Sequence, residues 1–375
     1  MEHGAQHPQP GHELVPLRKK LRHPGEIPWL AVAGVIFLVA YASLLALAIA
    51  TGLEADQGLS SNGTVVQVMG VLAVSPLLIL FARGILYAQL RTSSVRMSPT
   101  QFPEGYRMVV EAARAAGLPK VPDAYVRSGS GVINAFAAGH GFRRFVTVHS
   151  DLFEVGGAAR DPDALRFVIG HEVGHLAAGH ASYWRIVVMQ VMYQIPLLGR
   201  FLSRAQEYTA DNYGYNFCAT GAGGAIQVLS GGKYLNHNVN LHEFADRAGS
   251  ERGFFVWCAN LNATHPVLTW RAQALRDRTR PGSLFLRPNF QPYGPPALPP
   301  GNRPTREAPS PDEALAYLAA YPPVGPPQFG QNFPVPLPGQ EIQPGSASRY
   351  GEGTLYAGWQ GPQPINSGTG TPGGS

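Results

Sequence analysis

Two long apolar runs dominate the hydrophobic pattern near the start of the chain. Residues 27–50 and residues 64–82 contain no charged side chain. Each run reaches the roughly 20 apolar residues that cross a bilayer core as a helix. A cleavable signal peptide is the alternative for the first run, but its length and the second run close behind favour an uncleaved anchor. A buried core helix is the alternative for the second run, because Gln67, Ser75 and Pro76 interrupt it.

Residues 91–280 have the pattern of an ordinary folded domain. The segment 106–117 has helical periodicity and ends at a glycine. The segments AYVRS, VINAFAAG and RRFVTVHSDL predict three strands, the last because it is rich in Val, Phe and Thr. A small sheet followed by several helices predicts an α+β fold. The expected helical segments after the sheet are 161–180, 203–220, 224–235 and 265–278.

The chain changes again at residue 281, where Pro and Gly become abundant. Such a composition cannot bury enough apolar surface to offset the entropy of ordering, so residues 281–375 are predicted to be a disordered tail. Residues 312–321 have the pattern of a short amphipathic helix. PxxP stretches in the tail could bind the aromatic groove of an unidentified partner, although a solvated tail is the simpler interpretation.

Basic residues lie before the first apolar run and after the second, but not between them. The positive-inside rule therefore places residues 1–26 and everything after residue 91 in the cytoplasm, with two spans of the cell membrane and a short extracytoplasmic loop within residues 27–90. The net charge of +5 is largely due to these basic residues. It suits an anionic lipid surface and requires no nucleic acid as a partner. The basic residues that flank the two apolar runs are Arg18, Lys19, Lys20, Arg22, Arg83, Arg91 and Arg96.

The most informative chemistry lies in FVIGHEVGHLAAGH, residues 167–180. On a helix, His171 and His175 lie one turn apart on one face, where two neutral imidazoles can bind one Zn²⁺ per chain. Glu172 projects beside them, in a position to take a proton from a water molecule at the metal. A helix with satisfied surface histidines is the alternative, but the apolar neighbours favour a buried metal helix. Two cysteines, Cys218 and Cys258, are too few for a cysteine zinc site and are expected to be free, buried thiols.

Helix geometry excludes His180 as the third ligand. It lies nine residues after His171, and about 100° per residue turns it to the opposite side of the helix. We expect it to be a polar residue at the helix end, where the negative pole of the helix dipole favours it.

The segment SRAQEYTAD supplies a better third ligand. Glu207 and Asp211 are four residues apart and face the same way. Glu207 would complete a His₂Glu set with a fourth position open for water. Asp211 suits a carboxylate that holds a ligating imidazole by its other N–H, and Arg204 could orient both carboxylates. The alternative for this pair is a solvated helix face.

Residues 186–202 look apolar enough for a membrane, but they are not expected to span it. Only residues 176–206 separate His175 from Glu207, which is too few for two crossings, and a single crossing would separate the ligands. The segment is expected to cover the cleft or lie against the membrane surface, with burial in the core as the alternative.

The motifs together resemble the M48-type membrane-anchored zinc metallopeptidases, HtpX-like and CAAX prenyl endopeptidase-related gluzincins. The resemblance covers about residues 90–280 and rests on INAFAAG, HEVGH, the R-x-x-E-x-x-A-D run and THPVLTWRAQAL. It implies Glu207 as the third zinc ligand. It also implies that Asn134 and Ala135 lie on an edge strand that holds an extended substrate. His265 resembles the family's histidine near the tetrahedral intermediate, with a structural role as the alternative, and Arg271 matches the motif's arginine.

These features favour a membrane-anchored, cytoplasm-facing zinc endopeptidase that hydrolyses extended polypeptides, in membrane protein quality control or in the processing of a dedicated target. The alternative is a catalytically silent membrane scaffold with a metal-stabilised fold and a partner-binding tail. The intact Glu172 speaks against it, because such a remnant needs no base. A prenyl-processing chamber would need more spans than this chain has.

Overall fold

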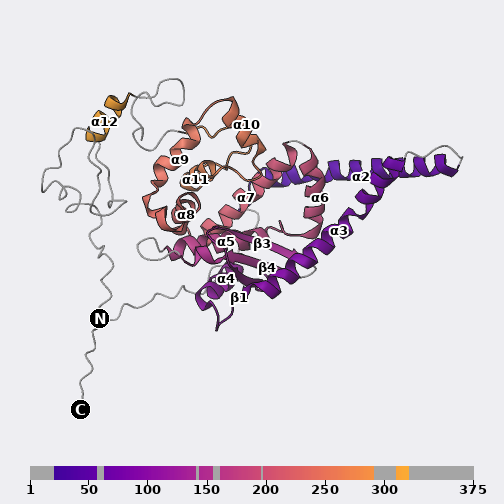
Figure 1. The fold of residues 1–375 in the computed structure, drawn as a ribbon, viewed down its shortest axis with the longest axis horizontal. Coiled ribbons are helices and arrows are strands. Elements are labelled where there is room, and N and C mark those ends of the chain that lie inside the picture. The colour runs from indigo at the N-terminus through magenta and orange to yellow at the C-terminus, as the bar shows by residue number, and fades with distance from the viewer. Residues whose placement is uncertain are drawn as a thin grey trace, which may run out of the picture.

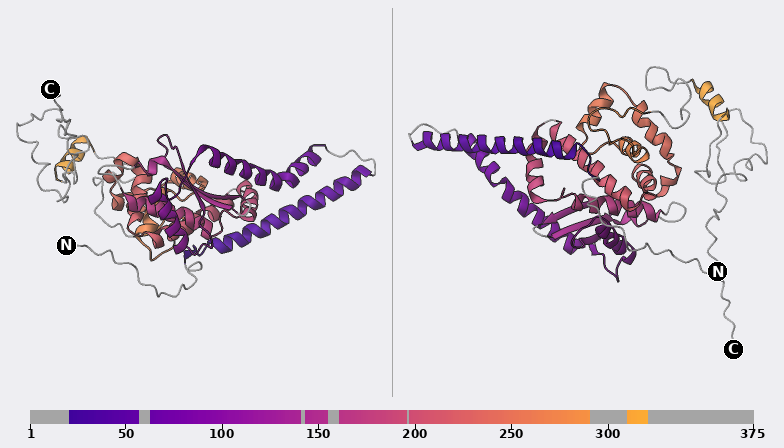
Figure 2. Two further views of the ribbon diagram at one scale, coloured as in Figure 1. Left: turned by 90° about the horizontal axis from the view of Figure 1, so that it is seen from below. Right: turned by 180° about the vertical axis from the view of Figure 1, so that it is seen from behind.

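Two long helices project from one side of a mostly helical domain in the computed structural model (Figure 1). They are α2 (Glu26–Asp56) and α3 (Gly63–Ser93), and they run outward together in all three views (Figure 2). The structure describes residues 21–56, 63–140, 143–154, 161–195, 197–290 and 310–320.

The domain contains one small mixed sheet with the strand order β1-β2-β4-β3. Strand β3 lies at an edge, where only β4 pairs with it, antiparallel. The three predicted strands are present, whereas β1 has only two residues and was too short to produce a sequence pattern. The strands are β1 (Val95–Arg96), β2 (Asp123–Arg127), β3 (Ala135–His140) and β4 (Arg143–His149).

Helices make up most of the remaining domain. All four expected helical segments contain a helix, whereas α9 and α10 were not expected. The domain helices are α4 (Pro103–Ala115), α5 (Pro162–Ala177), α6 (Tyr183–Gln194), α7 (Leu198–Phe217), α8 (Gly221–Leu235), α9 (Leu241–Ser250), α10 (Phe254–Asn262) and α11 (Leu268–Arg276), with 3-10 turns η1 (Ser150–Leu152) and η3 (Asn236–Asn238).

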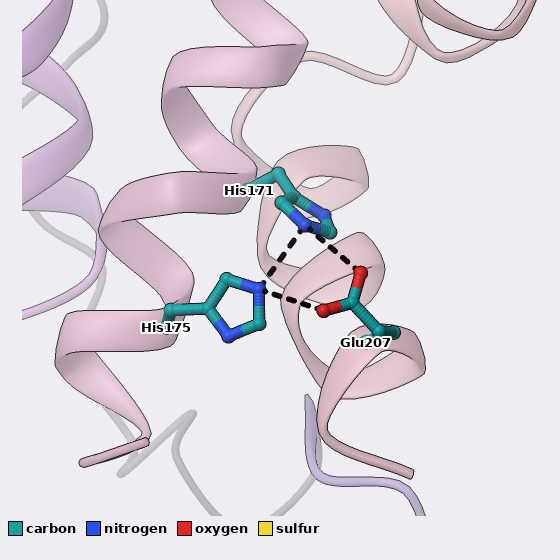
Figure 3. A group of neighbouring side chains, drawn as sticks. All are labelled: His171, His175 and Glu207. Carbon is teal, nitrogen blue, oxygen red and sulfur yellow. Dashed lines mark hydrogen bonds and ion pairs between the residues drawn. The ribbon is translucent and has the colours of Figure 1, made fainter. Parts of the chain in front are cut away.

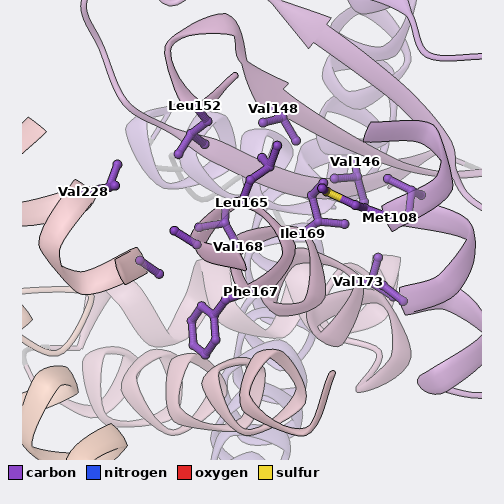
Figure 4. Packing of buried hydrophobic residues seen from close by; sticks show 14 of the residues in the cluster. Met108, Val146, Val148, Leu152, Leu165, Phe167, Val168, Ile169, Val173 and Val228 are labelled. Carbon is purple, nitrogen blue, oxygen red and sulfur yellow. The ribbon is translucent and has the colours of Figure 1, made fainter. Parts of the chain in front are cut away.

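Helix α5 is the centre of the fold. It is buried on nearly all sides, between the sheet with α4 on one side and α7 with α8 on the other. Phe167, Ile169 and Val173 of α5 belong to the main hydrophobic core, together with Val146 of β4 and Met108 of α4 (Figure 4). A helix that is apolar on nearly all sides is stable only when neighbours cover it, and this covering buries His171 and Glu172 of α5.

Both projecting helices have the length and the apolar composition to cross a membrane. The candidate spans are Glu26–Leu47 and Ala73–Ser93, and only 6% and 11% of their windows are buried, so neither is an ordinary core helix. Helix α3 contacts the domain from Pro76, whose carbonyl accepts a hydrogen bond from Tyr183 of α6, and again at Arg83, whose guanidinium donates to the carbonyls of Gly139 and Ala181.

Residues 186–202 do not form a spanning helix. Helix α6 has 12 residues, about 18 Å at 1.5 Å per residue, which is shorter than a bilayer core. Its Val188 and Met192 pack with Leu202 of α7 against Trp29 and Ala33 of α2. Burial in the core, the alternative interpretation, is therefore correct for this face of α6. The same face packs against α2 and holds that helix on the domain.

The C-terminal end of the domain lies beyond the predicted one. Arg204, Tyr208 and His23 all contact carbonyls within residues 282–284, so the folded domain extends beyond residue 280 to about residue 290. Residues 312–320 lie in helix α12 (Pro311–Ala320), close to the predicted amphipathic segment. Most of the predicted tail, and the basic residues Arg18, Lys19 and Lys20, lie outside the described residues. Both cysteines are free thiols, but Cys258 is only half-buried.

Candidate metal centre

Two local features fix where α5 begins, and the start of the helix determines where its two histidines lie. Pro162 occupies the first turn, where its missing N–H costs nothing, and the carboxylate of Asp161 accepts a hydrogen bond from the N–H of Ala164 (2.9 Å). From there the buried helix carries His171 and His175 to the wall of a cleft of ≈ 360 Å³.

His171, His175 and Glu207 point at one another from two neighbouring helices (Figure 3). The Nε2 atoms of the histidines are 3.2 Å apart. The carboxylate oxygens of Glu207 lie 3.6 Å from His171 Nε2 and 3.4 Å from His175 Nε2. The candidate ligand atoms all lie within 4.8 Å of one another. Two imidazoles and one carboxylate are the donor set of a catalytic zinc site with an open position, so these residues fit the metal.

The outer nitrogen of His171 is held by a carboxylate. Its Nδ1 lies 2.9 Å from Asp211 Oδ1, and Arg271 donates to both oxygens of Asp211 at 2.6 and 2.9 Å. This arrangement orients the ring so that Nε2 faces the ligand cluster. Burial alone would lower the pKa of His171, but the carboxylates of Asp211 and Glu207 outweigh it and raise this pKa to about 10.

The outer nitrogen of His175 is held by His180. Helix α5 ends in a Schellman motif, in which the N–H of Gly179 bonds to the carbonyl of Leu176 and the N–H of His180 bonds to the carbonyl of His175. Gly179 has the left-handed φ of +77° that this motif requires. The motif folds His180 back over His175, and their Nδ1 atoms are 2.8 Å apart.

Glu26, at the first residue of α2, lies on the far side of His180. Its carboxylate is fully buried and lies 3.2 Å from His180 Nε2. Arg22, Arg185 and Thr209 also donate to it. Burial lowers the pKa of His180 to about 4, so its ring is neutral. The expectation that His180 is a polar residue favoured only by the helix dipole is therefore wrong. His180 is a buried partner of the candidate ligand His175.

Glu172 lines the same cleft beside the three candidate ligands. It is buried, and this burial raises the pKa of its carboxyl group above the ordinary value. A carboxylate with a raised pKa beside a metal site is suited to accept and pass on a proton near neutral pH.

The edge strand β3 forms one wall of the cleft, which residues 134–138 line. The N–H of His149 donates to the carbonyl of Asn134 (2.9 Å). Inward and outward groups alternate along an antiparallel ladder, so the N–H and carbonyl of Ala135 face away from β4. Residues 134 and 135 thus border the cleft, where an extended chain could pair with the open edge.

His265 and Arg204 occupy different positions relative to the cluster. His265 is exposed at the rim, with Nε2 3.4 Å from Glu207 Oε1 and Nδ1 3.0 Å from Thr264 Oγ1. The prediction that Arg204 orients the carboxylates is wrong, because it donates to the carbonyls of Ala263 (3.0 Å) and Leu284 (2.7 Å), and also to that of Asn260. Arg204 lies about one turn before Glu207 on α7, but its guanidinium is taken up by these carbonyls, so it fastens the segment that precedes His265.

Comparisons with known proteins find metallopeptidases similar to this part of the chain. The family model of peptidase family M48 matches residues 99–197 and 182–279. The plastoglobule-localized metallopeptidase 48, chloroplastic, of Arabidopsis thaliana is 32% identical over 118 residues. This alignment covers 31% of the present chain and spans 33%, about a third, of the length of that protein.

Proposed function

We propose that the protein is a membrane-anchored zinc endopeptidase of peptidase family M48, the family whose model matches residues 99–197 and 182–279. The observation that carries the proposal is the convergence of His171, His175 and Glu207 on one point, with the buried carboxyl group of Glu172 beside them. A bound Zn²⁺ would polarise the scissile carbonyl and lower the pKa of a water molecule at the open position.

The side chains around the three candidate ligands have different roles in hydrolysis. Glu172 takes a proton from the attacking water and later passes it to the leaving amine. Asp211 and Arg271 hold the ring of His171 in place. His265, at the rim, donates a hydrogen bond to the oxyanion, for which preorganised donors are worth several kcal/mol.

The open edge of β3 determines how the substrate lies. An extended polypeptide adds to the sheet beside Asn134 and Ala135, which brings its backbone along the wall of the cleft toward Glu172. Main-chain pairing of this kind selects unfolded or extended segments rather than a particular side chain. The proposed substrates are therefore polypeptides in extended form, such as misfolded proteins or a flexible segment of a dedicated target.

Helices α2 and α3 provide the proposed membrane anchor. The residues that begin α2 and the residues that end α3 both contact the domain, at His23 with Thr209 and at Arg83 with Ala181. Two antiparallel crossings return the chain to its starting side, so the contacts fit a domain on the same side as the N-terminus. The distribution of Lys and Arg favours the cytoplasm for that side. Protease protection in sealed membrane vesicles tests this orientation, and protection of the domain in inside-out vesicles would contradict it.

The enzymatic proposal is tested with full-length protein in detergent micelles. Zinc content and cleavage of an unfolded protein are measured for the wild type, for Glu172→Gln and for the control Glu251→Gln, which changes an exposed carboxylate paired with Arg247. We expect one zinc ion per chain in all three and cleavage only in the wild type and the control. A wild type without zinc would overturn the proposal, as would undiminished cleavage by Glu172→Gln. A complete lack of cleavage by all three proteins, the wild type included, would favour a silent scaffold.

A further inference from the structure

A chain of two contacts, through the buried ring of His180, leads from the candidate ligand His175 to the base of the first apolar helix. His175 Nδ1 contacts His180 Nδ1 at 2.8 Å, and His180 Nε2 contacts Glu26 Oε1 at 3.2 Å. We propose that His180 and Glu26 are positioning residues, which orient His175 toward the metal and make the first turn of α2 part of the metal site. This inference rests on the proposed zinc site.

The direction of each hydrogen bond follows from the ligand at one end. When Nε2 of His175 faces a metal, the proton of this neutral ring is on Nδ1, which donates to Nδ1 of His180. His180 then carries its own proton on Nε2 and donates it to Glu26. Every link fixes the tautomer of the next, so the carboxylate at the end of the chain selects the tautomer of the ligand at its beginning.

The surroundings of Glu26 keep its carboxylate charged and in one place. Arg185 donates to Oε1 at 2.9 Å and Thr209 to Oε2 at 2.6 Å, and Arg22 also donates to Oε1. A buried carboxylate is expensive unless charged and polar partners surround it. Here those partners come from α6, from α7 and from the residues before α2, so the carboxylate is fixed to three parts of the domain.

The two ligand histidines are supported in parallel ways. His171 is backed by Asp211, which Arg271 holds, and His175 is backed by His180 and then by Glu26, which Arg185 holds. Both lines end in a buried carboxylate paired with an arginine. The difference is that the second line crosses to another part of the chain, the helix proposed to anchor the protein.

The position of α2 should therefore affect the metal site. Glu26 is followed by Trp29 and Ala33, which pack against α6 and α7. A displacement of this first part of α2 would withdraw the carboxylate from His180 and leave the ring of His175 free to turn. The consequence is a zinc affinity that depends on residues which contact neither the metal nor the substrate.

The test compares zinc affinities of full-length variants by competition with a chelator. His180→Leu removes both contacts of the ring. His180→Asn keeps an acceptor near the position of Nδ1 but cannot reach Glu26, and Glu26→Gln removes only the charge. Glu251→Gln is the matched control, because it removes the charge of a carboxylate that pairs with Arg247 and lies outside this contact chain. The visible spectrum of the Co²⁺-substituted protein reports the ligand geometry independently of activity.

We expect a zinc affinity about 10- to 100-fold lower in His180→Leu, a smaller loss in His180→Asn and Glu26→Gln, and a change of less than about twofold in Glu251→Gln. The double variant of Glu26→Gln and His180→Leu should bind no more weakly than His180→Leu alone, because both act through one contact chain.

A His180→Leu variant with wild-type affinity would overturn the inference, and so would additive losses in the double variant. If Glu26→Gln does not fold, His180→Asn tests the role of Glu26 instead, because this variant cannot reach Glu26. Wild-type zinc affinity in His180→Asn would overturn that role. A wild type that binds no zinc refutes the proposed function instead, so the two failures are distinguishable.

Discussion

Gly174 determines how closely the two ligand-bearing helices approach. It lies between His171 and His175 on α5 and faces Tyr213 of α7, the helix that carries Glu207. A Cβ atom added at Gly174 would lie 2.5 Å from Tyr213 Cβ and 3.3 Å from the carbonyl oxygen of Ala210. Carbon atoms prefer separations of about 3.5–4.0 Å. Since neither contact atom can rotate away, Gly174→Ala must separate α5 from α7 by about 1 Å.

This displacement is large for a metal site, whose ligand distances hold to about 0.2 Å. We therefore expect Gly174→Ala to lower zinc affinity at least tenfold. The cost to the fold is smaller, because overpacking costs about 1–3 kcal/mol while alanine returns about 1 kcal/mol of helix propensity. The free energy of unfolding of the metal-free protein should fall by no more than about 2 kcal/mol.

Chelator competition on the full-length protein measures the affinity, and thermal unfolding in excess chelator measures the fold. Gly223→Ala in α8 is the control, because its new methyl group would meet only the end of the Leu241 side chain, which can move. Wild-type zinc affinity in Gly174→Ala would refute the reasoning, since it would show that the spacing of the two helices does not limit the site. A loss of affinity equal to that of Gly223→Ala would do the same.

Three further predictions concern the surroundings of the site. Asp211→Asn should lower zinc affinity about 10- to 100-fold in the chelator assay, and an unchanged affinity would show that Asp211 does not hold His171. Ala135→Pro removes one outward N–H from the edge strand, so KM for an unfolded substrate should rise roughly 2- to 10-fold, the worth of one hydrogen bond, while zinc content and kcat stay unchanged. A rise in KM together with a loss of zinc would contradict a pure substrate role. Deletion of residues 291–375 should leave the thermal unfolding temperature unchanged, whereas deletion of residues 281–375 should lower it, because Arg204 and Tyr208 lose carbonyl partners. Equal temperatures would contradict the packing of residues 281–290.

The parts of the site that were predictable from sequence are those set by local periodicity. A spacing of four on a helix places two side chains on one face wherever the helix lies, so His171 with His175 and Glu207 with Asp211 could be paired before any fold was known. Helical patterning also identified α5 and α7, and uninterrupted apolar length identified the two apolar helices. The partners of Arg204 could not be found this way, because its target carbonyls are 56 to 80 residues away and lie at the end of α10 and in irregular segments.

The order of the strands also depended on contacts that sequence patterns do not encode. Alternation predicts that a segment is a strand, but not which neighbour it pairs with. The position of β3 at the edge follows from β2 pairing in parallel with β4, which leaves β3 with a single partner. The prediction that Ala135 borders a substrate cleft came instead from the resemblance to a family, and the open edge now gives it a physical basis.

His180 illustrates where a closer reading of local chemistry would have reached further. Helical angles correctly separate it from the face of His171, but they apply only while the helix continues. The sequence HLAAGH ends with glycine followed by histidine, and a glycine at this position predicts a Schellman motif, which brings the residue after the glycine beside the residue four positions before the glycine. For Gly179 those two residues are His180 and His175. The contact between the two rings could therefore have been predicted from the motif, whereas the role of Glu26 required the fold, since 154 residues separate it from His180.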